Sequence, residues 1–193
     1  STEQLFVGNG SDEVIDLLLR IFCIPGRDSI GTFSPTYGMY EVSAQIHDIA
    51  VKTVPLDANF DLVTTDFSAL FQTNDLKIIF LCSPNNPTGI VEPPELVQRV
   101  LDTVSDFGLL VVDEAYAQFS DWSALDLFDE DTAMIVTRTF SKTWAMAAAR
   151  LGYLIAPTWI VERLNTALLP YHLDAVSQAA GSAALDFEDQ MNP

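Results

Sequence analysis

The sequence predicts an α/β fold, in which a mostly parallel mixed sheet lies between two helical layers of a three-layer α/β/α domain. Short apolar runs rich in β-branched residues alternate along the chain with stretches whose apolar residues recur at helical spacing. Most of the short runs are apolar without alternation, which is typical of strands that helices bury on both faces. With 49% apolar residues among 193, the chain can form one domain with a substantial core.

The predicted strands are apolar runs of strand length bounded by turn residues. In chain order they cover residues 5–7, 29–33, 51–55, 77–82, 109–113, 134–138 and 151–155. A clear helical stripe of apolar residues extends over residues 12–22 and again over residues 94–107. Strands and helices therefore alternate, as expected where helical crossovers connect parallel strands.

The composition excludes several classes of partner and site. The 27 acidic residues outnumber the 9 basic ones, and the formal net charge of −18 repels nucleic acid and anionic membranes. Cys23 and Cys82 are too few for a disulfide framework and lie in apolar runs, so we expect reduced core thiols in a cytoplasmic protein. His47 and His172 lack ligand-like spacing, so no metal site is predicted. We find neither a signal peptide nor an apolar run long enough to span a membrane.

Polar and turn residues follow several predicted strands at the point where each strand ends. The segments cover residues 8–12, 34–37, 83–89, 113–116 and 139–142. Because the carboxyl ends of parallel strands meet at one edge of a sheet, where ligands bind, we expect these segments to form a single site. A lysine in a turn is usually exposed. The convergence of these segments instead favours a buried, functional Lys142. Because desolvating an ammonium group is costly, burial of this lysine needs a functional reason.

Two features of the sequence suit an anion. Gly10, Ser11 and Asp12 open the first predicted helix, where free N–H groups can bind an anion and glycine permits close backbone approach. An ordinary helix cap by Ser11 or Asp12 explains the same residues. Arg150 could be a surface cation, but bases are so few that we interpret it as a bidentate clamp for an anion such as phosphate.

The remaining candidates are polar side chains near the same edge. Asp113 follows four apolar residues, so we expect a buried carboxylate, which a metal ion, a helix cap or a protonated heteroaromatic nitrogen would satisfy. Residues 83–89, Ser-Pro-Asn-Asn-Pro-Thr-Gly, predict a rigid turn whose amides can also donate hydrogen bonds to a phenolate-like oxygen. Tyr37 and Tyr116 add phenolic groups, although either tyrosine is also compatible with a place in the core.

Together these motifs resemble the large domain of the fold-type I aminotransferases that use pyridoxal 5′-phosphate (PLP). The resemblance lies in residues 83–89, in Asp-Glu-Ala-Tyr at 113–116, and in Ser-Lys at 141–142 with Arg150 eight residues after the lysine. Within that superfamily, Gly-Asn-Gly-Ser-Asp-Glu at 8–13 and Pro-Thr-Tyr-Gly-Met-Tyr at 35–40 are most similar to the histidinol-phosphate aminotransferase family. The resemblance covers nearly the whole chain and is loose only from about residue 174.

The resemblance implies a role for each matching residue. Lys142 would form a Schiff base with the PLP aldehyde and then act as general base and acid at the substrate. Asp113 would keep the pyridine nitrogen protonated, which lets the cofactor accept electrons. Asn86 and Tyr116 would contact the 3′ oxygen of the ring, and Tyr37 would stack on its face. The phosphate would be held by residues at helix and strand ends: Gly10, Ser11, Asp12, Thr139, Ser141 and Arg150.

The implied activity is transfer of an amino group from L-histidinol phosphate to 2-oxoglutarate, giving imidazole acetol phosphate and glutamate in histidine biosynthesis. The implied partners are a small amino donor and a 2-oxo acid acceptor. Family members are substantially longer and form homodimers when full length. We therefore expect a PLP-binding large domain at residues 1–156. Residues 157–193 would be a helical segment leading toward a C-terminal small domain that is absent.

Other interpretations of the same residues stay open. The chain could belong to an aminotransferase for aromatic or other amino acids, or to a PLP-dependent decarboxylase or lyase with the same cofactor site. It could also be a truncated domain that binds PLP without catalysis. A nucleotide-binding Rossmann domain fits the alternation of strands and helices, but Glu13 stands where the third glycine of that fingerprint belongs.

Overall fold

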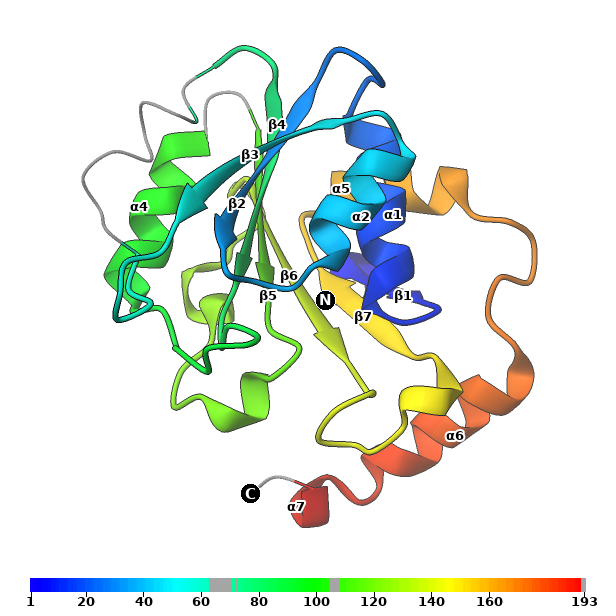
Figure 1. Ribbon diagram of the computed structural model, residues 1–193. Helices are drawn as coiled ribbons and strands as arrows, with labels where there is room; N and C mark the ends of the chain where they lie inside the picture. The colour runs from blue at the N-terminus through cyan, green and yellow to red at the C-terminus, as the bar shows by residue number, and fades with distance from the viewer. Residues whose placement is uncertain (63–70, 72, 105–107, 192–193) are drawn as a thin grey trace.

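The computed structural model describes residues 1–62, 71, 73–104 and 108–191, and in this part of the chain it confirms the predicted α/β/α class. A mixed seven-stranded sheet has the order β1-β7-β6-β5-β4-β2-β3. Helices α1, α2 and α5 cover one face of the sheet, and α4 covers the other (Figure 1).

The strands lie within one residue of the predicted ranges. They are β1 (Leu5–Gly8), β2 (Ser29–Ser34), β3 (Ala50–Pro55), β4 (Leu76–Cys82), β5 (Leu109–Asp113), β6 (Met134–Thr139) and β7 (Gly152–Ile155). Strands β2 to β6 are parallel, whereas β7 runs antiparallel to both β6 and β1. The carboxyl ends of β4, β5 and β6 therefore lie side by side, and Asp113 pairs in register with both Cys82 and Thr137.

The helices predicted at residues 12–22 and 94–107 are confirmed, and the structure contains further helices. They are α1 (Ser11–Phe22), α2 (Met39–Ile46), α4 (Pro94–Val104), α5 (Thr158–Ala167), α6 (Ala175–Leu185) and α7 (Glu188–Met191). Short 3₁₀ turns are η1 (Thr2–Gln4), η2 (Ala117–Phe119), η3 (Ala124–Leu127) and η4 (Ala147–Ala149). The helix predicted at 94–107 is α4, and residues 105–107 lie outside the described part. Among the described residues no helix is long and apolar enough to cross a membrane.

Strand β5 explains why the predicted strands are apolar without alternation. Leu109 and Val111 belong to the core cluster beneath α1, whereas Leu110 and Val112 belong to the cluster beneath α4. Successive side chains of a strand point to opposite faces, so a strand covered by helices on both sides is apolar throughout. At the end of this strand, Asp113 is a buried carboxylate in an otherwise apolar setting.

Helix α5 corrects the predicted boundary of the large domain at residue 156. Ile160, Val161 and Leu164 are buried in the same core cluster as α1. Burying this apolar face stabilises α5 on the sheet, where it contacts α1, β1 and η1. The prediction is therefore wrong for α5. Helices α6 and α7 lie apart from the helices that cover the sheet (Figure 1), and α6 contacts η4.

Candidate active site

A cavity of about 160 Å³ lies where β4, β5 and β6 end. Its lining brings together every predicted site residue except Gly10, which directly precedes Ser11. The predicted residues in the lining are Ser11, Asp12, Tyr37, Asn86, Asp113, Tyr116, Thr139, Ser141, Lys142 and Arg150. Three further residues, Cys82, Ala115 and Ala147, complete the lining. Segments far apart in the sequence therefore meet at one edge of the sheet, as the sequence predicts.

Asp113 is the buried acid of this cavity, with 3% of its surface exposed. Its Oδ2 accepts a 2.6 Å hydrogen bond from the Tyr40 hydroxyl, and its Oδ1 accepts one of 3.0 Å from the Ala115 N–H. Among the described residues no cation forms an ion pair with it. Burial raises the pKa of Asp113, and the bonds from Tyr40 and Ala115 partly oppose this. A protonated heteroaromatic nitrogen in the cavity would supply the missing positive charge.

Lys142 lines the same cavity from the turn that follows β6. Its Nζ stands 5.3 Å from the centre of the Tyr116 ring, close enough for a cation–π contact. The expectation of a buried lysine is wrong, because Lys142 is exposed. The turn projects beyond the end of the strand, so the lysine lines the cavity without being enclosed.

An anion-binding corner is built where α1 begins. Gly10 has a φ of +83°, and Ser11 opens the helix, whose first-turn N–H groups have no partners within the helix. The Arg150 guanidinium lies against this turn: a Cβ added to Gly10 would stand 2.5 Å from its Nη2. A Cβ added to Gly152 would clash with the Ser11 nitrogen. Glycine is therefore needed at position 10 for the approach of Arg150 and at position 152 for the approach of the start of α1. A phosphate group suits such a corner.

Hydroxyl groups extend this corner at the end of β6. Thr139 Oγ1 donates to Ser141 Oγ at 3.0 Å and accepts from the Ser141 N–H at 3.1 Å. These bonds fold the chain back after the strand and hold both hydroxyls at the cavity wall. The corner therefore combines a helix N-terminus, a guanidinium and two hydroxyl groups, which are the usual ligands of phosphate oxygens.

Tyr37 and Asp12 close the side of the cavity near α2. The Tyr37 hydroxyl donates to Asp12 Oδ1 at 2.9 Å, and burial followed by this bond raises the pKa of Tyr37 well above its usual range. The Tyr37 ring packs edge-on against Tyr40, with centroids 5.6 Å apart. Tyr40 does not line the cavity but reaches it through Asp113. The motif at 35–40 ends in Tyr40, but the sequence predicts no role for this residue.

The two asparagines of the 83–89 turn have different surroundings. Asn86 lines the cavity. Asn85 is buried instead between two turns: its amide donates to the Pro35 carbonyl and to Thr88 Oγ1, both at 3.0 Å, and accepts from Thr36. Asn85 therefore holds the 35–37 segment, including Tyr37, against the turn that carries Asn86.

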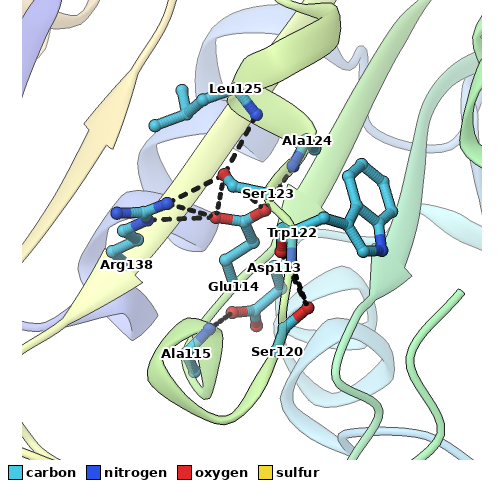
Figure 2. Close-up of polar contacts among 9 residues, drawn as sticks. All are labelled: Asp113, Glu114, Ala115, Ser120, Trp122, Ser123, Ala124, Leu125 and Arg138. Carbon is cyan, nitrogen blue, oxygen red and sulfur yellow. Dashed lines mark hydrogen bonds and ion pairs between the residues drawn. The ribbon is translucent and has the colours of Figure 1, made fainter. Parts of the chain in front are cut away.

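Glu114 points to the side of the sheet opposite Asp113 and makes a buried ion pair. Arg138 donates to its Oε2 from Nε at 3.0 Å and from Nη2 at 2.7 Å, and Ser123 and the Ala124 N–H complete the network (Figure 2). This network ties the end of β5 to β6 and to η3. A larger hollow of about 760 Å³ extends from it to α6, and none of the predicted site residues lines that hollow.

The cysteines are both buried and free. Cys82 also lines the cavity, where burial raises the pKa of its thiol to about 12, so it stays protonated at neutral pH. Among the described residues, no three or more His, Cys, Asp and Glu side chains are grouped so that they could hold a metal ion.

The fold and site define an α/β domain with a small-molecule cavity at the carboxyl ends of its strands, walled by an acid, a lysine and an anion-binding corner. The sequence of the chain identifies the protein family to which this domain belongs. The chain belongs to the family of class I and II aminotransferases, whose family model matches residues 1–193. The predicted family resemblance is thereby confirmed.

Curated relatives are similar to this chain over nearly its whole length. The histidinol-phosphate aminotransferase of Cytophaga hutchinsonii is 49% identical over 186 residues, which are 96% of this chain and 53% of the relative. That of Parabacteroides distasonis is 42% identical over 191 residues, covering 97% of this chain and 54% of the relative. The chain thus spans about half the length of the curated relatives it matches.

Solved structures share the fold. A histidinol-phosphate aminotransferase from Sinorhizobium meliloti, in complex with pyridoxal-5′-phosphate, superposes with a TM-score of 0.87 at 23% identity, covering 99% of this chain and 52% of that one. An aspartate aminotransferase from Thermotoga maritima gives 0.88 at 24% identity, covering 98% and 52%. At such identities the likeness establishes the architecture alone.

Proposed function

We propose that this chain is the PLP-binding part of a histidinol-phosphate aminotransferase. The observation that carries the proposal is the buried carboxylate of Asp113, which lacks a cation among the described residues and shares a cavity with Lys142 and the anion-binding corner. PLP carries a basic ring nitrogen, an aldehyde and a phosphate. The cavity has an acid for the first, an amine for the second and a corner of donors for the third.

The positions of the lining residues suggest which part of the cofactor each would contact. Arg150, Ser141, Thr139 and the first turn of α1 would bind the phosphate and neutralise its charge. Asn86 and Tyr116 would donate hydrogen bonds to the ring oxygen, and the side chain of Tyr37 would limit movement of the ring. These contacts would orient the cofactor.

The chemistry depends on two groups that line the cavity, Asp113 and Lys142. PLP, when bound, supplies an electron sink for the electron pair left when the Cα–H bond of an amino acid breaks. The carboxylate of Asp113 would stabilise positive charge at the ring nitrogen, which strengthens that sink. The amine of Lys142 would hold the aldehyde at rest and, once free, move a proton to and from the substrate Cα.

The identity of the substrate is supported by the curated relatives, which are named as histidinol-phosphate aminotransferases at 42% to 49% identity. We propose L-histidinol phosphate as amino donor and 2-oxoglutarate as acceptor, within histidine biosynthesis. We also propose a cytoplasmic homodimer for the full-length protein; the two free, buried cysteines are consistent with a reducing compartment. The chain from α6 onward would lead toward the substrate-binding small domain.

The proposal is tested by loading purified protein with PLP and removing the excess by gel filtration. We expect the retained cofactor to absorb as a lysine-bound form and to become permanently attached on borohydride reduction. Addition of L-histidinol phosphate to the full-length enzyme should convert the cofactor to its amino form, and 2-oxoglutarate should restore it. A response to aromatic amino acids alone would favour the broader aminotransferase, and absence of PLP retention would refute the proposal.

A further inference from the structure

Tyr40 is held rigidly with its hydroxyl at Asp113. It lies in the first turn of α2, and only 1% of its surface is exposed. Its ring stacks on Phe80 with centroids 4.7 Å apart and planes 8° from parallel, and Tyr37 meets it edge-on. Contacts from both neighbours fix the ring, so the hydroxyl has a defined direction toward Asp113 Oδ2, 2.6 Å away.

The hydrogen bond from Tyr40 matters because the surroundings of Asp113 oppose its ionisation. Burial raises the pKa of this carboxyl, and the negative charge of Asp12 acts in the same direction. The titratable groups around it are Tyr37 just before α2, Tyr40 on α2, Cys82 at the end of β4 and Asp12 on α1, together with Lys142 and Arg150, which line the same cavity. Hydrogen bonds to the charged form stabilise it, and Tyr40 supplies one of them.

Tyr40 is suited to be a permanent donor. Burial, followed by the nearby charge of Asp113, raises the pKa of Tyr40 well above its usual range, so it keeps its proton. The Cys82 thiol is a weaker donor and is directed to the Pro84 carbonyl at 3.4 Å. The backbone N–H of Ala115 donates to the other carboxylate oxygen, Oδ1 of Asp113. Thr137, paired in register with Asp113 on β6, adds a weaker stabilising contact to the carboxylate, after those of Tyr40 and Ala115.

We propose that Tyr40 is a positioning residue of the cofactor site: its hydroxyl keeps Asp113 ionised and oriented so that the ring nitrogen of the bound cofactor retains its proton. This inference rests on the proposed function. A buried acid and a pyridine nitrogen share one proton, and whichever partner is more basic holds it. Removal of the Tyr40 bond makes the carboxylate more basic, so the proton moves from the nitrogen to Asp113.

The test uses PLP labelled with ¹⁵N in its ring and the nitrogen chemical shift of the loaded protein. Tyr40→Phe keeps the stack on Phe80 and deletes only the hydroxyl. We expect the wild-type signal to be that of a protonated ring and the variant signal to move toward that of an unprotonated one. A hydrogen bond to a charged group is worth enough to change this proton equilibrium about ten- to a hundredfold. Asp113→Asn gives the reference signal for a nitrogen without its acid.

Tyr153→Phe is the matched control, because it deletes the hydroxyl of a partly buried tyrosine on β7 that does not line the cavity. Its nitrogen signal should match that of the wild type. If the wild type retains PLP and Tyr40→Phe gives the wild-type signal, the inference is wrong and the proposed function stands. If the wild type retains no PLP, the proposed function fails and this inference fails with it.

A second measurement needs no cofactor and covers the case in which Tyr40→Phe folds poorly. The Asp113 carboxyl is titrated by ¹³C NMR in the apo protein, with fluorinated tyrosine at position 40 as a second variant. Fluorination makes the phenol a stronger donor, so the pKa of Asp113 should fall, whereas Tyr40→Phe should raise it. An Asp113 titration that is unchanged in the fluorinated variant would overturn the role given to Tyr40.

Discussion

Arg150 and Asp12 form an ion pair across the anion-binding corner, with Nη2 of the arginine 3.3 Å from Oδ2 of the aspartate. Arg150 follows η4 in the left-handed conformation, with a φ of +52°, and Asp12 lies in the first turn of α1. The pair therefore fixes a guanidinium beside a helix N-terminus before any anion arrives. Both groups are partly exposed, so the pair itself adds little to stability, and its main effect is to position the arginine.

Arg150→Gln should weaken PLP binding without unfolding the protein. The variant removes a charged, bidentate donor from the corner, and we expect the dissociation constant for PLP to rise about ten- to a hundredfold. Titration of cofactor absorbance measures this change. Arg20→Gln is the control. Arg20 lies in the last turn of α1, away from the cavity, and pairs with Asp16. Equal affinities for Arg150→Gln and the wild type would contradict the assigned phosphate site.

Lys142→Ala should abolish covalent attachment of PLP after borohydride treatment. Lys142 is exposed and contacts the Tyr116 ring, so its removal should leave the melting temperature nearly unchanged. Mass spectrometry of the reduced protein identifies the modified residue. Lys77→Ala, which removes a lysine whose ammonium donates to the Asn74 carbonyl outside the cavity, should be labelled like the wild type. Labelling of Lys142→Ala at full yield would show that another amine holds the cofactor.

Tyr40 and Lys142 mark the limits of what the sequence predicts here. Strand ends follow from apolar runs, so Asp113 is correctly expected at the binding edge, where it lines one cavity with Arg150. The burial of Lys142 depends on what covers a turn, which no local pattern records. No role is predicted for Tyr40, because its partner Asp113 lies 73 residues away and its short helix has little amphipathic pattern. Contacts between distant segments decide both cases.

Helix α5 shows a related limit. Its apolar residues Ile160, Val161 and Leu164 recur at helical spacing, but the sequence does not state which surface they cover. The structure places them on the same core as α1 and β1. The fold class, by contrast, is predictable, since uninterrupted apolar strands admit few arrangements other than a sheet covered on both faces.

Arg138→Met should destabilise the fold, because it leaves the Glu114 carboxylate buried without its cation. Removing one partner of a buried ion pair costs about 3 kcal/mol or more. Only 4% of the Glu114 side chain is exposed, so solvent cannot replace the arginine. Urea unfolding of the apo protein measures the loss. Arg163→Met on the exposed side of α5 is the control and should remain within about 0.5 kcal/mol of the wild type. A small effect of Arg138→Met would show that the network in Figure 2 relaxes on mutation.

Glu92 should make the apo protein less stable as the pH rises from mildly acidic values to neutral. Burial, followed by the nearby charge of Asp61, raises the pKa of Glu92 to about 7 from an ordinary value of 4.5. Between these values the folded state binds more protons than the unfolded state, so the free energy of unfolding falls as the pH increases. Below this range the carboxyl is protonated in both states and has no such effect. Above it, the full cost of the buried charge is present.

Glu92→Gln removes this titration and should flatten the pH profile of stability between pH 5 and about 8. We expect the variant to exceed the wild type by about 1 to 2 kcal/mol at the upper end, after allowance for solvent screening, and to show no such gain at the lower end. Urea unfolding at several pH values measures the difference. Glu95→Gln changes an exposed glutamate in the first turn of α4 and should retain the wild-type slope. Parallel profiles for Glu92→Gln and the wild type would show that Glu92 ionises in the folded protein without cost.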